Sequence, residues 1–348
     1  MHKVKFVIFK IKKLFFPFCI CLFTILLLVF SKTNLSSAKS GLSLWANSVV
    51  PSLLPFFIAT ELLSYTNVVS YLGKLLNKFM RPIFNVPGEG SFPFIMGIIS
   101  GYPVGAKIVA DLKRQNLCSS IEAERLIAFT NNSGPLFIVG TVGIGLFKDS
   151  KTGVLLLITH ILACITVGFL FRWWKWSKRN SFSNISNNML PSKICLSNLG
   201  EVLAISIMNA INTIFLIGGF VVLFSVIISI LNSSGSLDLI ANFLSPILNA
   251  FGLSSKYIKG ILTGLIELTN GVCSIALIYT KNISLNIIIC AFLLGFGGIS
   301  VALQVLSITS KNGISIKPYL IGKFLQGCFA AFYTYLFLKN IIFFNLDL

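Results

Sequence analysis

The sequence predicts an all-α, polytopic membrane protein, and three observations support this. Of its 348 residues, 55% are hydrophobic and only 11% are charged, whereas soluble domains carry about 25% charged residues. Apolar runs long enough to cross a bilayer alternate with short polar segments. The net charge of +18 comes mostly from Lys and Arg between these runs. At such positions they act as topology signals, so we expect a lipid bilayer around the chain and no nucleic acid partner.

The apolar runs predict about seven transmembrane helices, because a bilayer core about 30 Å thick requires about 20 apolar residues in a helix. Five runs are uninterrupted: 14–30, 44–66, 153–174, 203–231 and 318–343. Two more are long enough but contain Asn-Asn-Ser-Gly-Pro or Gly-Phe-Gly-Gly: 122–148 and 284–309. The first run follows a basic segment, and the two together could form a signal peptide. We expect an uncleaved first helix instead, and in either case the basic flank keeps residue 1 in the cytoplasm.

Two further apolar stretches break in the middle and predict re-entrant hairpins. Residues 92–110 break at Ser-Gly-Tyr-Pro, and residues 256–280 break at Glu-Leu-Thr-Asn-Gly. Glycine and proline at these points interrupt a helix without ending the apolar stretch. Two amphipathic stretches, 70–86 and 237–251, predict helices that lie along the membrane surface.

These elements recur in the same order, which indicates an internal repeat. Residues 97–101 match residues 260–264, which follow 163 positions later, and residues 82–85 match residues 246–249. If each broken stretch enters and leaves the membrane on one side, each unit crosses three times. An odd number of crossings makes the second unit inverted relative to the first.

The distribution of cations agrees with this inverted repeat. With the N-terminus in the cytoplasm, 17 Lys and Arg fall on the cytoplasmic side and eight on the opposite side. Basic residues favour cytoplasmic loops, so we expect one leading helix, three plus three crossings and an external C-terminus. The predicted divisions are a leading segment, a first repeat, a cytoplasmic linker and a second repeat: 1–40, 41–175, 176–200 and 201–348.

The breaks indicate what such a protein does. Interrupting a helix inside a membrane frees N–H and C=O groups that lipid cannot satisfy, at a cost of several kcal/mol each. Such breaks persist where they pack in protein or face water. Two inverted copies bring their breaks together near the midplane, where half-helix N-termini suit an anion and freed carbonyls suit Na⁺ or a proton donor. The pattern predicts a secondary transporter.

Three motifs resemble the sporulation integral membrane proteins of the YlbJ family: PSLLPFF (51–57), GIISGYPVGAK (97–107) and FTNNSGP (129–135). That family belongs to the wider group with the nucleoside-recognition Gate domain, related to concentrative nucleoside transporters. The resemblance spans roughly residues 40–343. It implies a protein of endospore formation that moves a small anion, with dipicolinate as the candidate, across the outer forespore membrane. A nucleoside-type transporter is the alternative, and a homo-oligomer is compatible with the resemblance.

The first hairpin supplies the first candidate substrate-binding residues, at the tip: Ser100, Gly101, Tyr102 and Pro103. Glycine lets the backbone approach a ligand, proline fixes φ, and Ser and Tyr supply hydroxyls; a tight packing turn is the alternative. Lys107 follows on the returning arm, where a charge inside a membrane is costly and usually functional. It could bind a substrate carboxylate, reach the cytoplasmic face or pair with Asp111.

The interrupted helices and the second hairpin supply the remaining candidates. The polar groups next to Pro135 either contact a ligand or cap the two half-helices: Asn131, Asn132, Ser133 and Gly134. The second half contributes matching candidates: Thr269, Asn270, Gly297, Gly298 and Ser300.

Two carboxylates are candidate coupling residues. Glu267, in the second hairpin, could accept a proton, hold a cation or take part in an internal salt bridge. Glu61, in the span after PSLLPFF, could couple in the same way or pair with a buried cation such as Arg125.

The residues do not favour an enzyme, a metal site or a bound cofactor. Eight cysteines are scattered without a CxxC pair, and only two histidines occur; His160 reads as a packed polar residue. Ser100 and Lys107 would form a Ser-Lys dyad, but Gly-Tyr-Pro between them indicates a turn. The other alternative is a non-transporting assembly or scaffold protein of the spore membrane, which an uptake assay distinguishes.

Overall fold

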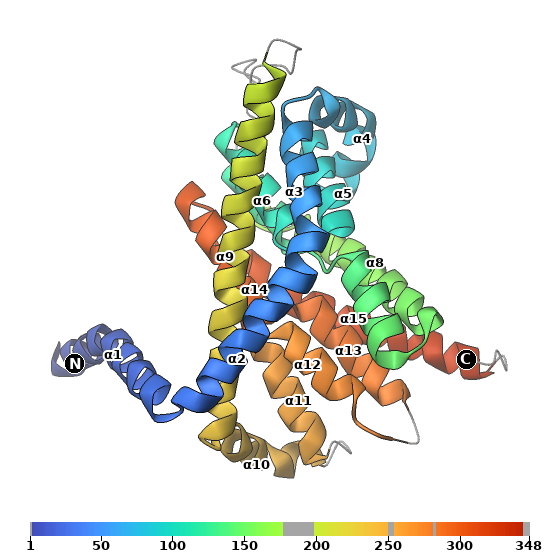
Figure 1. Cartoon of the computed structure of the whole chain (residues 1–348). Helices are drawn as coiled ribbons and strands as arrows, with labels where there is room; N and C mark the ends of the chain where they lie inside the picture. Colours follow the sequence, from blue (N-terminus) through green and yellow to red (C-terminus); the bar gives the residue numbers. More distant parts are fainter. Residues whose placement is uncertain (1, 177–197, 250–253, 281–282, 344–348) are drawn as a thin grey trace.

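The computed structural model describes residues 2–176, 198–249, 254–280 and 283–343, and all regular structure within them is helical (Figure 1). The predicted all-α class is therefore confirmed. The predicted linker, 176–200, lies outside the described residues except at its two ends.

The first half starts with two helices that meet at a bend of 98°: α1 (His2–Val29) and α2 (Ser31–Leu44). After them the chain forms a π-helical turn, two helices and a 3₁₀ turn: η1 (Trp45–Val49), α3 (Val50–Ser64), α4 (Val68–Phe84) and η2 (Gly88–Gly90). Two broken elements and one long helix complete this half: α5 (Ser91–Ser100), α6 (Val104–Arg114), α7 (Ser120–Thr130), π-helical η3 (Leu136–Phe147) and α8 (Ser150–Phe171).

From α9 on, the second half follows the order of elements of α3–α8: a helix, a short amphipathic helix, a broken pair, an interrupted helix and a long helix. The long helix and the short helix come first: α9 (Leu199–Ser233) and α10 (Ser236–Asn249). The remaining elements are α11 (Ser255–Ile266), α12 (Leu268–Ala276), α13 (Ser284–Phe296), α14 (Gly298–Thr309), η4 (Ser310–Asn312) and α15 (Lys317–Phe343).

Four described helices are long and apolar enough to cross a membrane, and α1 with α2 would make a fifth span if the bent pair counts as one. The four are Ser150–Phe171, Leu199–Ser233, Ser284–Asn312 and Lys317–Lys339. The predicted count of seven stays a prediction. It requires runs 44–66 and 122–148 to cross as well, and each of these is divided into shorter helices.

The helices break where the sequence predicts. α5 gives way to α6 at Gly101-Tyr102-Pro103, and α11 gives way to α12 at Glu267. Between α13 and α14, Gly297 and Gly298 adopt φ of 84° and 81°. These angles lie in the left-handed region, which glycine adopts without steric cost.

The broken pairs approach the middle of the molecule from opposite ends. The two short amphipathic helices, α4 and α10, lie at opposite ends of the long α9 (Figure 1). α5 and α6 lie toward the α4 end, whereas α11 and α12 lie toward the α10 end. α8, α13 and α15 pack against one another beside them. This arrangement leaves the breaks near the centre.

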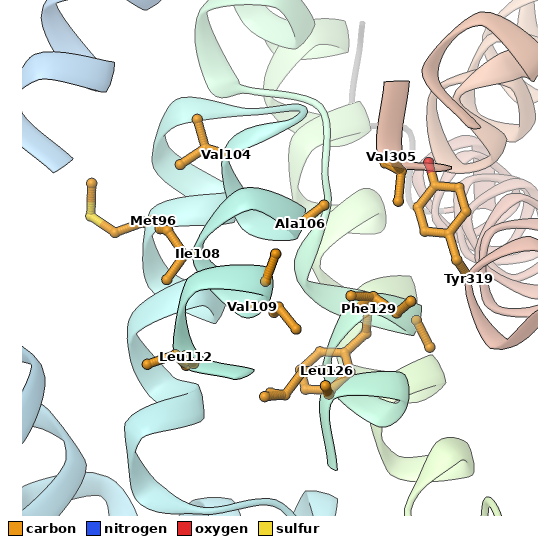
Figure 2. Close-up of a cluster of buried hydrophobic side chains, with 14 of the residues drawn as sticks. Met96, Val104, Ala106, Ile108, Val109, Leu112, Leu126, Phe129, Val305 and Tyr319 are labelled. Carbon is orange, nitrogen blue, oxygen red and sulfur yellow. The ribbon is translucent and has the colours of Figure 1, made fainter. Parts of the chain in front are cut away.

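A buried apolar cluster fixes the first broken pair against α7 (Figure 2). Val109 and Leu126 are fully buried in it, and Val305 and Tyr319 join from the second half. Gly97 and Gly105 allow this packing, because a side chain at either would collide with the carbonyl oxygen of Thr130. α5, α6 and the end of α7 are therefore in direct backbone contact.

Candidate functional site

A central cavity of about 370 Å³ lies where the broken elements of the two halves meet. Its walls also include parts of α2, α3 and α9. Seven of the sequence-predicted residues line it: Ser100, Gly101, Tyr102, Gly134, Glu267, Thr269 and Ser300. The structure therefore brings the two predicted hairpin tips and both interrupted helices to one space.

The cavity offers hydrogen-bonding groups and one carboxylate. The hydroxyl of Ser100 is buried and has no hydrogen-bond partner in the protein. Thr269, Ser300 and Gln304 of the second half also line the cavity. Among the described residues, no Lys or Arg lines this cavity, so its only formal charge is that of Glu267.

The Glu267 side chain caps α12. Its carboxylate accepts hydrogen bonds from the backbone N–H groups of Thr269 and Asn270, at 3.0 and 2.8 Å. A negative charge at a helix N-terminus is favoured by the helix dipole. Within the described residues Glu267 takes part in no ion pair, so the salt bridge considered from sequence is not found there.

Tyr102 forms the wall between the cavity and the protein interior. Its hydroxyl forms a hydrogen bond with the hydroxyl of Ser133 and donates to the carbonyl of Leu294 at 3.1 Å. The bond Tyr102–Pro103 is a cis peptide. One side chain thus joins the first hairpin tip, the break after α7 and α13 of the second half.

Behind Tyr102 lies a buried polar cluster that also holds the predicted amides. Asn131 and Asn132 are fully buried and do not line the cavity. Lys323 donates to the carbonyl of Asn131 and to Gln326 Oε1, both at 2.8 Å. Gln326 in turn donates to Asn132 Oδ1 at 2.8 Å. The amides therefore connect the break to α15 and do not face the central space.

His160 belongs to the same cluster. Its Nε2 lies 3.3 Å from the backbone N–H of Ser133 and 3.3 Å from the amide nitrogen of Gln326. An Nε2 that accepts from both requires the proton on Nδ1. Nδ1 is buried without a hydrogen-bond partner.

Sequence reasoning missed Lys323 and Gln326 as functional candidates. The available signal was their spacing along the last apolar run. Tyr319, Lys323, Gln326 and Thr334 recur at intervals of three or multiples of four residues, which places them on one helix face. All four are buried.

Lys107 and Glu61 lie outside the central cavity, in a smaller cavity of about 40 Å³ next to it along α3 and α6. Lys107 Nζ lies 2.5 Å from Glu61 Oε1. Thr213 and Asn209 of α9 add hydrogen bonds to Lys107 and Glu61, at 3.1 and 3.2 Å. The two residues singled out separately from sequence are therefore partners.

This pairing replaces both partners considered from sequence. Asp111 pairs with Arg114 at 2.9 Å and not with Lys107. Arg125 donates to the backbone carbonyls of Asn85 and Trp174 and not to Glu61.

Three further predicted residues line neither of these two cavities. Asn270 lines a third cavity of about 520 Å³, together with Lys256 and Lys259, on the α10 side. Gly297 faces the ring of Tyr102, and Gly298 lies against the carbonyl of Gly264.

Comparison with known proteins identifies the family of the chain. The Gate family, described as nucleoside recognition, matches residues 46–172 and 214–312. These two segments make up more than half of the chain. The chain belongs to the Gate family.

The chain is 38% identical over 324 residues to the sporulation integral membrane protein YlbJ of Bacillus subtilis strain 168. The aligned region covers 89% of this chain and 79% of the relative. No solved structure matches.

The Gate match contains most of the cavity wall. Its first segment includes Ser100 and Tyr102, and its second includes Glu267 and Ser300. Lys323 lies beyond both segments. With its long apolar helices and its YlbJ relative, this Gate protein is an integral membrane protein of the sporulation type.

Proposed function

We propose that this Gate protein is a secondary transporter that moves a small anionic solute through the central cavity. The observation that carries the proposal is the cavity itself, to which both broken pairs and both interrupted helices contribute. Interrupted helices that meet around a shared cavity are how membrane transporters build a midplane binding site.

The arrangement of the two halves supports an inverted repeat with three crossings each. α4 and α10 lie at opposite ends of α9, and each is followed by a broken pair that approaches the centre from its own end (Figure 1). In this proposal α5–α6 and α11–α12 are re-entrant hairpins, α4 and α10 lie along the two membrane surfaces, and the halves rock about the cavity.

The chemistry of the cavity suits a small solute with carboxylate or carbonyl oxygens. The Ser100 hydroxyl has no hydrogen-bond partner in the protein, and Ser300, in the first turn of α14 at the positive end of that helix dipole, lines the space. The relative is named for sporulation. Dipicolinate, crossing the outer forespore membrane, is therefore the candidate that we propose.

Glu267 sets the condition for coupling. A carboxylate that shares the cavity with an anion repels it unless a proton or a cation enters as well. We therefore assign coupling to Glu267, with H⁺ or Na⁺ as the accompanying ion. The Glu61–Lys107 pair is the second coupling candidate, because it borders the neighbouring space.

The test is solute uptake by the full chain in proteoliposomes. We expect accumulation of dipicolinate, with a nucleoside as the comparison solute, driven by an ion gradient. Thr269→Trp should abolish uptake, because the indole fills the cavity. Leu277→Trp, at the exposed end of the same α12, should leave uptake unchanged.

Two results would redirect the proposal. Uptake of the nucleoside and not dipicolinate would favour a nucleoside-type transporter, in line with the family description. A reconstituted, folded protein that moves neither solute under any gradient would favour a non-transporting assembly or scaffold protein of the spore membrane. We assign no enzymatic reaction to the chain.

A further inference from the structure

Lys323 is a cation buried without an acidic partner. Its side chain is 1% exposed, and within the described residues no carboxylate lies within ion-pair distance of it. Its ammonium instead donates to the backbone carbonyl of Asn131 and to the side-chain oxygen of Gln326, both at 2.8 Å. A buried charge is costly unless its surroundings compensate it.

The compensation comes from the end of α7. Asn131 is the capping residue directly after Thr130, the last residue of α7, so its carbonyl lies at the break and has no intrahelical partner. The C-terminus of a helix carries a partial negative charge. A cation placed there satisfies both the freed oxygen and the dipole.

The other groups around the ammonium are neutral or aromatic. Tyr102 of the hairpin tip presents its ring, with the centroid 5.7 Å from Nζ, at the distance of a cation–π contact. α8 contributes His160 and Cys164, next to Gln326 and Asn132. Tyr319, one turn before Lys323 on α15, contacts Asn131. The ammonium is therefore held by oxygens and a π face, as a metal cation would be.

In transporters, freed carbonyls and C-terminal ends of half-helices are where Na⁺ binds. We infer that the Lys323 ammonium is a tethered cation that takes the place of an exchangeable Na⁺ at the end of α7, so that solute movement needs no Na⁺. This inference rests on the proposed transport function and narrows it. Of the two ions proposed to accompany the solute at Glu267, H⁺ and Na⁺, only H⁺ then remains.

Thermal unfolding of the purified full chain tests the inference without requiring transport. The wild-type melting temperature should be the same in Na⁺ and in choline at equal ionic strength, because the site is already filled. Lys323→Ala should lower the melting temperature by several degrees in choline. Rising Na⁺ should restore part of that loss, because a ligand that binds only the folded state stabilises it.

Two matched variants distinguish the loss of the tethered cation from a general loss of packing. Lys339→Ala changes an exposed lysine of the same helix and should shift the melting temperature in neither salt. Gln326→Leu removes one ammonium ligand but keeps Lys323, so it should lower the melting temperature equally in Na⁺ and choline.

Several outcomes would overturn the inference. A wild-type protein stabilised by Na⁺ and not by choline would show that the folded chain still binds an exchangeable Na⁺, and this comparison decides the matter even if Lys323→Ala does not fold. A folded Lys323→Ala protein with no Na⁺ response would also overturn it. In proteoliposomes, uptake only with Na⁺ would refute the inference and keep the transport function, whereas no uptake in any ion would refute the function alone.

Discussion

Lys107 and Glu61 show how residue-scale chemistry settles a question that the sequence leaves open. A lysine in an apolar stretch can serve a substrate, reach the membrane surface or pair with an acid. In the structure, the 2.5 Å contact between Lys107 and Glu61 joins α6 to α3. Lys107 also donates a hydrogen bond to Thr213 of α9, and Glu61 accepts one from Asn209 of the same helix. Lys107 and Glu61 therefore neutralise each other's charge in the wall of the smaller cavity.

We expect this pair to contribute measurably to stability. Lys107→Met or Glu61→Gln alone should each lower the free energy of unfolding by about 1.5 kcal/mol. This value is the lower end of the range for hydrogen bonds to charged groups, and it applies because both side chains keep some exposure to solvent. The double variant should lose less than the sum of the two, and a double-mutant cycle of chemical unfolding measures this coupling.

A surface pair provides the control for that cycle. Arg114 and Asp111 are also in contact, at 2.9 Å, but the Arg114 side chain is 71% exposed. Arg114→Gln should therefore change the free energy of unfolding by less than about 1 kcal/mol. Equal losses from both pairs would contradict the structural role given to Glu61 and Lys107.

At the scale of elements, the first broken pair and α7 are locked together by close backbone contact. Gly97 and Gly105 lie against the carbonyl of Thr130, and Leu126 and Val109 pack beside them (Figure 2). Closely packed protein interiors have low compressibility, so the displacement of one helix is transmitted to the helices packed against it. α5, α6 and α7 should therefore move as one unit.

Glycine substitutions test this contact. Gly97→Ala should lower the free energy of unfolding by about 1–3 kcal/mol, because the added methyl forces the backbones of α5 and α7 apart. Gly219→Ala on α9 is the matched control: a side chain there meets no atom within 4 Å, so better helix propensity should stabilise the protein by up to about 1 kcal/mol. Similar losses of stability at both positions would show that the close approach of the backbones at Gly97 does not contribute to the free energy of unfolding.

At the scale of the whole molecule, the proposed topology assigns opposite sides of the membrane to the two ends of α9. The halves share one order of elements, and α4 and α10 lie at opposite ends (Figure 1). Three crossings per half after one leading helix would put the linker in the cytoplasm and the C-terminus outside.

Reporter fusions check this topology. Green fluorescent protein inserted within residues 176–200 should fluoresce, because it folds in the cytoplasm, and alkaline phosphatase fused after residue 348 should be active, because it requires the outside. The reciprocal fusions should be silent. If both positions report the same side, the second half does not cross an odd number of times and the inverted repeat is wrong.

Single residues explain which parts could be predicted from the sequence. Gly297 and the Gly-Tyr-Pro after Ser100 mark breaks, because local backbone chemistry alone dictates an interruption there, and the breaks lie at those positions. The meeting of Ser100 with Thr269 and Ser300 in one cavity also follows the predicted pairing of breaks.

Other parts depend on tertiary contacts that no local pattern encodes. Nothing near Lys107 in the sequence identifies Glu61 as its partner, since the two lie on different helices. Asn131 and Asn132 looked suited to a ligand, yet they contact Lys323 and Gln326 of α15. An amide next to a break has the same local sequence whether it meets a solute or a distant helix.

The hydroxyl of Tyr102 has a consequence for how the cavity opens. It contacts Ser133 of the first half and Leu294 of the second at the same time. Any motion that separates the halves at this point must break the bond to Leu294, whereas the bond to Ser133 lies within the first half. In the proposed transport cycle, the barrier to opening is therefore set partly by one phenol, which also lines the solute cavity.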